Sequence, residues 1–129
     1  MNVVDSSAWL EYFADGPNAA AFAPAIEDTG ALVVPSLTLF EVYKRVLQQE
    51  GEPAALRAVT AMQQGVVMDL DARLAIAGAR LSVETGLPLA DGAILATARA
   101  CGAVLWTQDA DFEGLAQVEY RRRVDRGPI

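Results

Sequence analysis

Four acidic side chains stand in this sequence where they could form a site that cleaves phosphodiesters. Asp5 directly follows an apolar run at residues 2–4, and Asp109 follows another that ends two residues earlier. Glu41 lies in a segment with helical composition, and Asp91 begins a stretch in which apolar residues recur at helical spacing. Ligands gather at the carboxyl ends of the strands in open α/β sheets, so these acids are candidates for a common site.

Each of these acids also has an ordinary structural interpretation. Asp5 and Asp91 could be N-caps of helices, where a carboxylate accepts hydrogen bonds from free backbone N–H groups. Glu41 could pair with Arg45 one helical turn later, and Asp109 could be a turn residue. No single acid therefore identifies a function.

Taken together, the four acids are more informative. If they converge at one end of the sheet, they cannot all stay ionised without a cation. A set of oxygen ligands suits Mg²⁺ or Mn²⁺, and such an ion can activate water for attack on a phosphate. The residues themselves thus point to metal-dependent phosphodiester hydrolysis.

The composition excludes several other chemistries. The chain has no histidine, which removes catalytic triads, the HExxH metalloprotease and imidazole bases. Its one cysteine, Cys101, cannot form an internal disulfide, and this favours a reducing cytoplasm. The formal charge of −7 argues against a nonspecific nucleic-acid-binding module, although arginines cluster near the C-terminus and leave room for a local phosphate-contacting patch.

Short apolar runs alternate with longer segments rich in Ala, Leu, Glu and Arg. This alternation predicts an α/β protein: a three-layer α/β/α sandwich with a mostly parallel sheet of four to five strands. The expected buried strands are at 2–4, 31–35, 65–70 and 103–107, with a last edge strand within 118–124. The expected helices are at 7–14, 19–28, 37–50, 53–64, 72–85 and 91–101.

The length of 129 residues suits one domain spanning 1–129. No apolar stretch is long enough for a membrane span, and the N-terminus has no basic and apolar pattern of an export signal. We therefore expect a cytoplasmic protein.

Four segments resemble, in order and spacing, the motifs of the PIN-domain family. They read VVDSSAWL at 3–10, PSLTLFE at 35–41, LPLADGAILATA at 87–98 and LWTQDADF at 105–112. The resemblance covers essentially the whole chain, and its specificity comes from the ordered set. The short length makes the chain most similar to toxins of the VapC type.

The resemblance implies roles for particular residues. Asp5, Glu41 and Asp91 would be catalytic metal ligands, directly or through water, and Asp109 would complete the site, with Asp111 as the alternative fourth acid. The supporting hydroxyls would be those of Ser6 and Thr107, with Ser7 as an alternative to Ser6 whose main role is to cap the first helix. Lys44 and Arg45, one turn beyond Glu41, would be candidates for contact with an RNA phosphate.

The resemblance also implies an activity and partners: a Mg²⁺-dependent endoribonuclease, with Mn²⁺ as a substitute ion, that acts as the toxin of a toxin-antitoxin pair. Its partners would be RNA, a cognate VapB-type antitoxin and a second copy of the chain. Alternatives are a catalytically silent PIN-like binding module and a metal-dependent phosphodiesterase with a non-RNA substrate. A phosphorelay receiver, with Asp69 or Asp71 as phosphoacceptor, is disfavoured because Lys44 is the only lysine.

Overall fold

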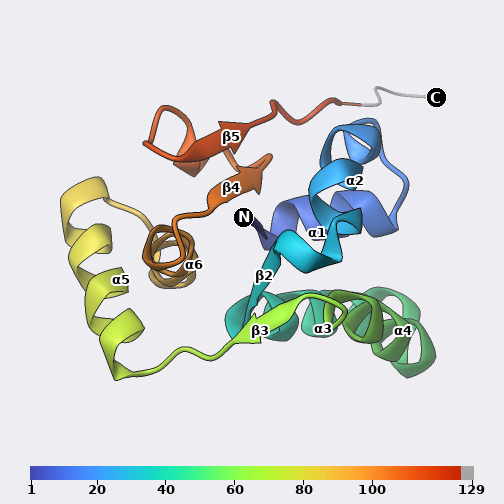
Figure 1. The fold of residues 1–129 in the computed structure, drawn as a ribbon. Helices are drawn as coiled ribbons and strands as arrows, with labels where there is room; N and C mark the ends of the chain where they lie inside the picture. Colours follow the sequence, from blue (N-terminus) through green and yellow to red (C-terminus); the bar gives the residue numbers. More distant parts are fainter. Residues whose placement is uncertain (126–129) are drawn as a thin grey trace.

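The computed structural model describes residues 1–125, and its core is a five-stranded parallel sheet (Figure 1). The strand order is β3-β2-β1-β4-β5, and every neighbouring pair is parallel. The strands are β1 (Asn2–Val4), β2 (Leu32–Pro35), β3 (Val66–Met68), β4 (Val104–Thr107) and β5 (Val118–Tyr120). The predicted α/β class and parallel sheet are confirmed.

Helices connect successive strands and cover both faces of the sheet. They are α1 (Ser6–Phe13), α2 (Ala19–Glu27), α3 (Ser36–Glu50), α4 (Glu52–Met62), α5 (Ala72–Thr85) and α6 (Leu89–Ala100), with 3-10 turns η1 (Thr29–Ala31) and η2 (Ala110–Phe112). Figure 1 shows α5 and α6 on one side of the sheet and α1 to α4 on the other. The three-layer prediction is therefore confirmed as well.

Alternating side chains of the central strands divide the core into two clusters. Val4 packs with α1 to α4, whereas its neighbour Val3 packs with α5 and α6. Val34 and Val33 of β2 divide in the same way. Because successive strand residues point to opposite faces, a strand covered on both sides must be apolar throughout, which explains the uninterrupted apolar runs.

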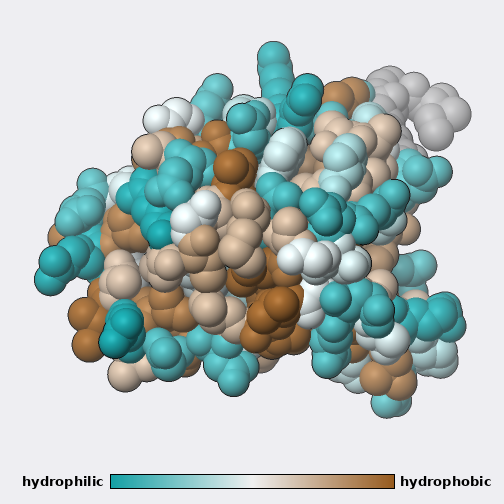
Figure 2. Space-filling view, viewed as in Figure 1, coloured by the Kyte–Doolittle hydropathy of each residue, from teal (hydrophilic) through white to brown (hydrophobic). Residues whose placement is uncertain are grey.

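One edge strand, β3, differs from expectation, whereas β5 lies at the edge within the expected range of 118–124. The strand predicted to be buried at 65–70 is shorter, and Val66 of β3 is 58% exposed because β3 lies at the edge of the sheet. Figure 2 shows apolar surface over β3 and the beginning of α5. The last strand, β5, ends at Tyr120, and the exposed arginines 121–123 follow it.

Helix α6, which carries Asp91, is held unusually close to α5. A Cβ added to Gly78 would lie 2.9 Å from Ala93 Cα, and one added to Gly92 would lie 2.7 Å from the Gly78 carbonyl oxygen. Both distances are too short for a side chain. The glycine pair therefore allows the backbones to touch and sets the position of α6 against α5.

Candidate active site

Asp5 occupies the carboxyl end of the central strand β1 and is 3% exposed. It is the N-cap of α1, as one ordinary interpretation predicted, but its carboxylate has further partners. Asp5 Oδ2 accepts hydrogen bonds from Ser7 Oγ at 2.7 Å and from Thr107 Oγ1 at 2.9 Å. Burial raises the pKa of Asp5, these hydrogen bonds oppose that effect, and the charge of Glu41 raises the pKa further.

Glu41 projects from α3 toward the same region. Its Oε1 accepts a hydrogen bond of 2.7 Å from Ser6 Oγ. Within residues 1–125 no ion pair joins Glu41 to Arg45, so the ordinary helical salt bridge does not form. Ser7 donates to Asp5 rather than capping α1, because Asp5 itself is the cap.

Asp91 lies in the first turn of α6 rather than at its N-cap. The helix begins at Leu89, and Pro88 is the N-cap without a side-chain capping bond. The N-cap interpretation of Asp91 is therefore wrong. Proline, with its fixed φ and no N–H, suits the start of a helix, and this moves the boundary two residues upstream of the expected one.

The pKa of Asp91 reflects electrostatic repulsion from the other acids of the site. It is raised to about 7, first by burial and then by the negative charges of Asp5, Asp109, Glu41 and Asp111. Four carboxylates, from α3, the end of β1 and the turn after β4, thus disfavour the ionised form of one half-buried group. The predicted convergence of the acids at one end of the sheet is present in the structure.

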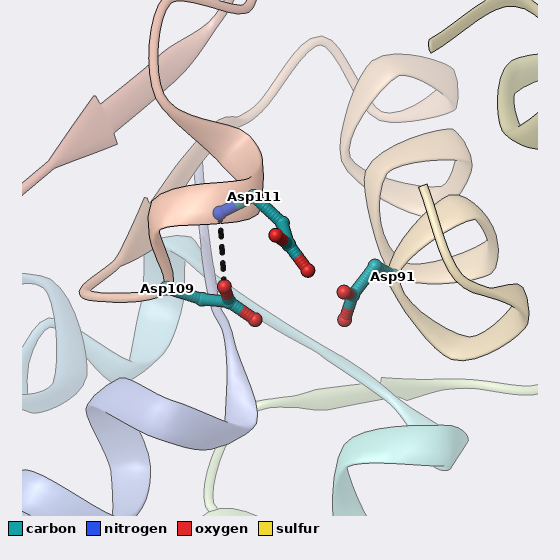
Figure 3. Close-up of side chains that lie close together, drawn as sticks. All are labelled: Asp91, Asp109 and Asp111. Atoms are coloured by element: carbon teal, nitrogen blue, oxygen red, sulfur yellow. Dashed lines mark hydrogen bonds between the residues drawn. The ribbon is translucent and has the colours of Figure 1, made fainter. Parts of the chain in front are cut away.

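Asp109 and Asp111 belong to the turn after β4 and face Asp91 on α6 (Figure 3). Asp109 Oδ1 accepts a 2.9 Å hydrogen bond from the backbone N–H of Asp111, so Asp109 caps η2. One carboxylate oxygen from each of the three acids lies within 4.8 Å of the others. Both candidates for the fourth acid are therefore at the site, Asp109 half-buried and Asp111 exposed.

Thr107 connects the two strand ends that carry Asp5 and Asp109. Its buried hydroxyl donates to Asp5 Oδ2 and accepts a 2.9 Å hydrogen bond from the backbone N–H of Asp109. One hydroxyl thus contacts both the Asp5 carboxylate and the backbone of Asp109. Ser7 Oγ adds a contact to the backbone N–H of Gln108 at 3.2 Å.

The acids open into a cleft of about 1010 Å³ between α1, α3, α6 and the segment after β4. This volume is at the upper limit of small-molecule sites, which suits a segment of a polymer. Lys44 and Arg45 line the cleft and are exposed. Asp69 and Asp71 are not among its lining residues, and Asp71 instead caps α5.

The donor set fits a hard divalent cation. It consists of carboxylates, with hydroxyls behind them, and includes no histidine or cysteine. Asp91, Asp109 and Asp111, whose carboxylate oxygens lie within 4.8 Å of one another, could hold such an ion. A cation there would also relieve the mutual repulsion that raises the pKa of Asp91.

Sequence reasoning missed Asn18 and Gln108, which border the site, and anticipated Arg123 only as one member of the C-terminal arginine cluster. Asn18, in the connection between α1 and α2, bonds to Gln108 Oε1, and Gln108 and Arg123 line the cleft. Gln108 could have been noticed because it lies between Thr107 and Asp109. Nothing in the sequence indicates that Asn18 lies beside them, since 90 residues separate it from Gln108.

Comparison with known proteins agrees with this geometry. The family model described as PIN domain matches residues 3–118, which include every acid of the site. The chain belongs to the PIN-domain family. No curated protein sequence matches the chain.

Several solved structures share this PIN fold. A toxin-antitoxin complex from Klebsiella pneumoniae superposes with a TM-score of 0.79 at 21% identity, over 92% of this chain and 96% of that one. The VapC20 sarcin-ricin loop cleaving toxin from Mycobacterium tuberculosis gives 0.74 at 21% identity, over 92% and 98%. DNA-bound VapBC from Salmonella typhimurium gives 0.72 at 17% identity, over 94% and 96%. At these identities, the similarity shows the fold.

Proposed function

We propose that this PIN-domain protein is a Mg²⁺-dependent endoribonuclease, with Mn²⁺ as a substitute ion, and the toxin of a toxin-antitoxin pair. The convergence of Asp5, Glu41, Asp91 and Asp109 in one open cleft carries the proposal. Support comes from the shared fold, since similar structures include a toxin that cleaves the sarcin-ricin loop and several toxin-antitoxin complexes.

A bound divalent cation would supply a Lewis acid that activates water and stabilises the leaving oxygen. The protein's own side chains orient the acids and would bind the substrate. Thr107 and Ser7 hold Asp5 in one orientation, and Ser6 holds Glu41. Lys44 and Arg45 have no hydrogen bond or ion pair with any residue of 1–125, so both are available to phosphates that flank the scissile bond.

The decisive experiment is cleavage of total RNA by the purified protein. The reaction is run with Mg²⁺, with Mn²⁺ and with EDTA, alongside Asp5→Asn and Asp91→Asn variants and an Asp28→Asn control. Asp28 is exposed and precedes β2, at the opposite edge of the sheet. We expect discrete metal-dependent cuts that Asp28→Asn retains and the site variants lose.

Two results would count against the proposal. Cleavage of single-stranded DNA but not RNA would make the protein a metal-dependent phosphodiesterase with another substrate. Absence of any cleavage, with the protein folded and metal bound, would favour a catalytically silent binding module.

We further propose a cognate VapB-type antitoxin, a homodimer and a cytoplasmic location. The toxin-antitoxin complexes among the similar structures support the first. Exposed apolar side chains on α5, Ile76 at 67% and Val83 at 88%, support contact with a second copy. Among residues 1–125, no helix is long and apolar enough to span a bilayer. Light scattering of the wild type and of Val83→Lys tests the dimer, which the lysine should weaken.

A further inference from the structure

The strand order places positive charge on both sides of the acids. At the carboxyl edge of the sheet, α3 follows β2, Asp5 follows β1, Asp109 follows β4 and the arginine segment follows β5. Lys44 and Arg45 therefore lie on one side of the acidic centre, and Arg123 lies on the other. All three line the same cleft. Three strand intervals separate β2 from β5, roughly 14 Å, so the two groups would meet different phosphates of one strand.

Asn18 fastens the arginine segment to the site. Its Nδ2 donates to the Arg122 carbonyl oxygen at 2.9 Å and to Gln108 Oε1 at 3.1 Å, while its backbone N–H donates to Glu11 Oε2 at 2.8 Å. A carbonyl oxygen can only accept, so the orientation of the Asn18 amide is determined. The two bonds use both hydrogens of Nδ2 and join the ends of β4 and β5.

The orientation of Gln108 follows from that of Asn18. Because Oε1 of Gln108 faces Asn18, its amide nitrogen is directed away and keeps two donors. That nitrogen has no hydrogen-bond partner among residues 1–125. The residue is only 3% exposed and lines the cleft, but the nitrogen is not one of the fully buried unpartnered atoms, so it keeps access to the cleft. A donor held in this way is available to a ligand oxygen.

Arg123 supplies a charge beside that donor. It is exposed, lines the cleft and forms no hydrogen bond or ion pair within the described part of the chain. A guanidinium can bind phosphate oxygens through two N–H groups at once. In a chain with a net charge of −7, such a cation also offsets the repulsion between the acids and RNA.

We propose that Gln108 and Arg123 form a subsite for an RNA backbone phosphate on the β5 side of the scissile bond, and that Asn18 holds this subsite together. The proposal rests on the nuclease function above, and it adds the path that the RNA strand takes across the site. The RNA strand crosses the acidic centre from the α3 cations to Arg123.

The test is binding of a fluorescein-labelled, single-stranded oligoribonucleotide of mixed sequence, followed by fluorescence anisotropy. All variants carry Asp91→Asn to prevent cleavage, contain Mg²⁺ and are checked for folding by circular dichroism. Arg123→Ala should raise Kd about tenfold, which is the loss of about 1.4 kcal/mol. It should also reduce the slope of log K against log salt by ~0.7, the value for one phosphate contact.

Arg122→Ala is the matched control. It removes the same charge from the adjacent position, keeps the carbonyl that Asn18 binds, and its side chain does not line the cleft. Its Kd should change less than about threefold. Asn18→Ala should weaken binding, and Arg123→Ala should then have a smaller effect than in the presence of Asn18, because the two act together.

Equal weakening by Arg122→Ala and Arg123→Ala would overturn the subsite, and so would absence of RNA binding. Cleavage by the protein without Asp91→Asn is measured in parallel, which separates the two proposals. Cleavage with no dependence on Arg123 would leave the nuclease standing without the subsite. Binding that depends on Arg123, with no cleavage by the wild type, would support the phosphate subsite and contradict the nuclease function.

Discussion

Asp91→Asn should stabilise the protein in the absence of metal. The pKa of Asp91 is raised from its ordinary value of 3.8 to about 7, so above pH 7 the folded protein carries a charge that burial and four acids oppose. At about 1.36 kcal/mol per pKa unit, this difference corresponds to roughly 4 kcal/mol. Asp91 is only half-buried, and water screens its charge, so we expect about 2 kcal/mol.

The sign of the effect sets the pH window. The pKa of Asp91 is higher in the folded than in the unfolded protein, so protonation of Asp91 favours folding. This stabilisation is fully present below pH 4 and is lost as pH rises through 7. The wild type should therefore lose stability relative to Asp91→Asn between about pH 4 and pH 7. Above that range the variant should unfold at a temperature roughly 7 °C higher, given 129 residues.

Thermal and urea unfolding in EDTA, from about pH 4 to about pH 8.5, measure this difference. Asp28→Asn serves as control and should follow the wild type, because its exposed carboxylate lies at the opposite edge of the sheet. Added Mg²⁺ should raise the stability of the wild type more than that of Asp91→Asn, since binding to the folded state stabilises it. If wild type and Asp91→Asn have the same stability and pH dependence in EDTA, the argument from converging acids is refuted.

Substitutions at four other positions test the supporting hydroxyls and the fourth acid. Thr107→Val should lower the free energy of unfolding by about 1–3 kcal/mol in urea titrations, because it leaves the Asp5 carboxylate and the Asp109 N–H without this hydrogen-bond partner. Thr107→Ser keeps the hydroxyl and should retain most of the wild-type stability. Ser6→Ala should weaken Mn²⁺ binding about tenfold in calorimetry through loss of its bond to Glu41; an unchanged affinity would show that Glu41 acts without it. Asp109→Asn should reduce the cleavage rate about 100-fold and Asp111→Asn less than about tenfold, since Asp109 is the less exposed of the two; the reverse order would make Asp111 the fourth acid.

The arrangement of the sheet could be inferred from sequence because its strands leave a strong local pattern. Buried parallel strands are apolar on both faces, so residues 2–4 and 32–35 stand out between helical segments. Edge strands lack this constraint. The run at 65–70 is just as apolar, yet only Val66–Met68 form β3, and Val66 is exposed. Local composition does not indicate which strand takes an edge position in the sheet.

The acids of the site could be inferred for a related reason. Asp5 and Asp109 follow strands directly, and parallel strands bring their carboxyl ends to one edge. The start of α6 was misplaced because Leu89 and Ala90 precede Asp91 without a capping side chain to mark the boundary. The contact of Asn18 with Gln108 depends only on tertiary packing, which no local pattern records.

The central position of β1 has a consequence for the synthesis of this protein. β1 is made first, but its neighbour β4 comes late, and the hydrogen bond between Asp5 and Thr107 joins residues 102 positions apart. Contacts of such long range form slowly, and a nascent chain that ends before β4 lacks both Thr107 and Asp109. A nascent chain therefore has no complete acidic centre until β4 and residue 109 have been synthesised.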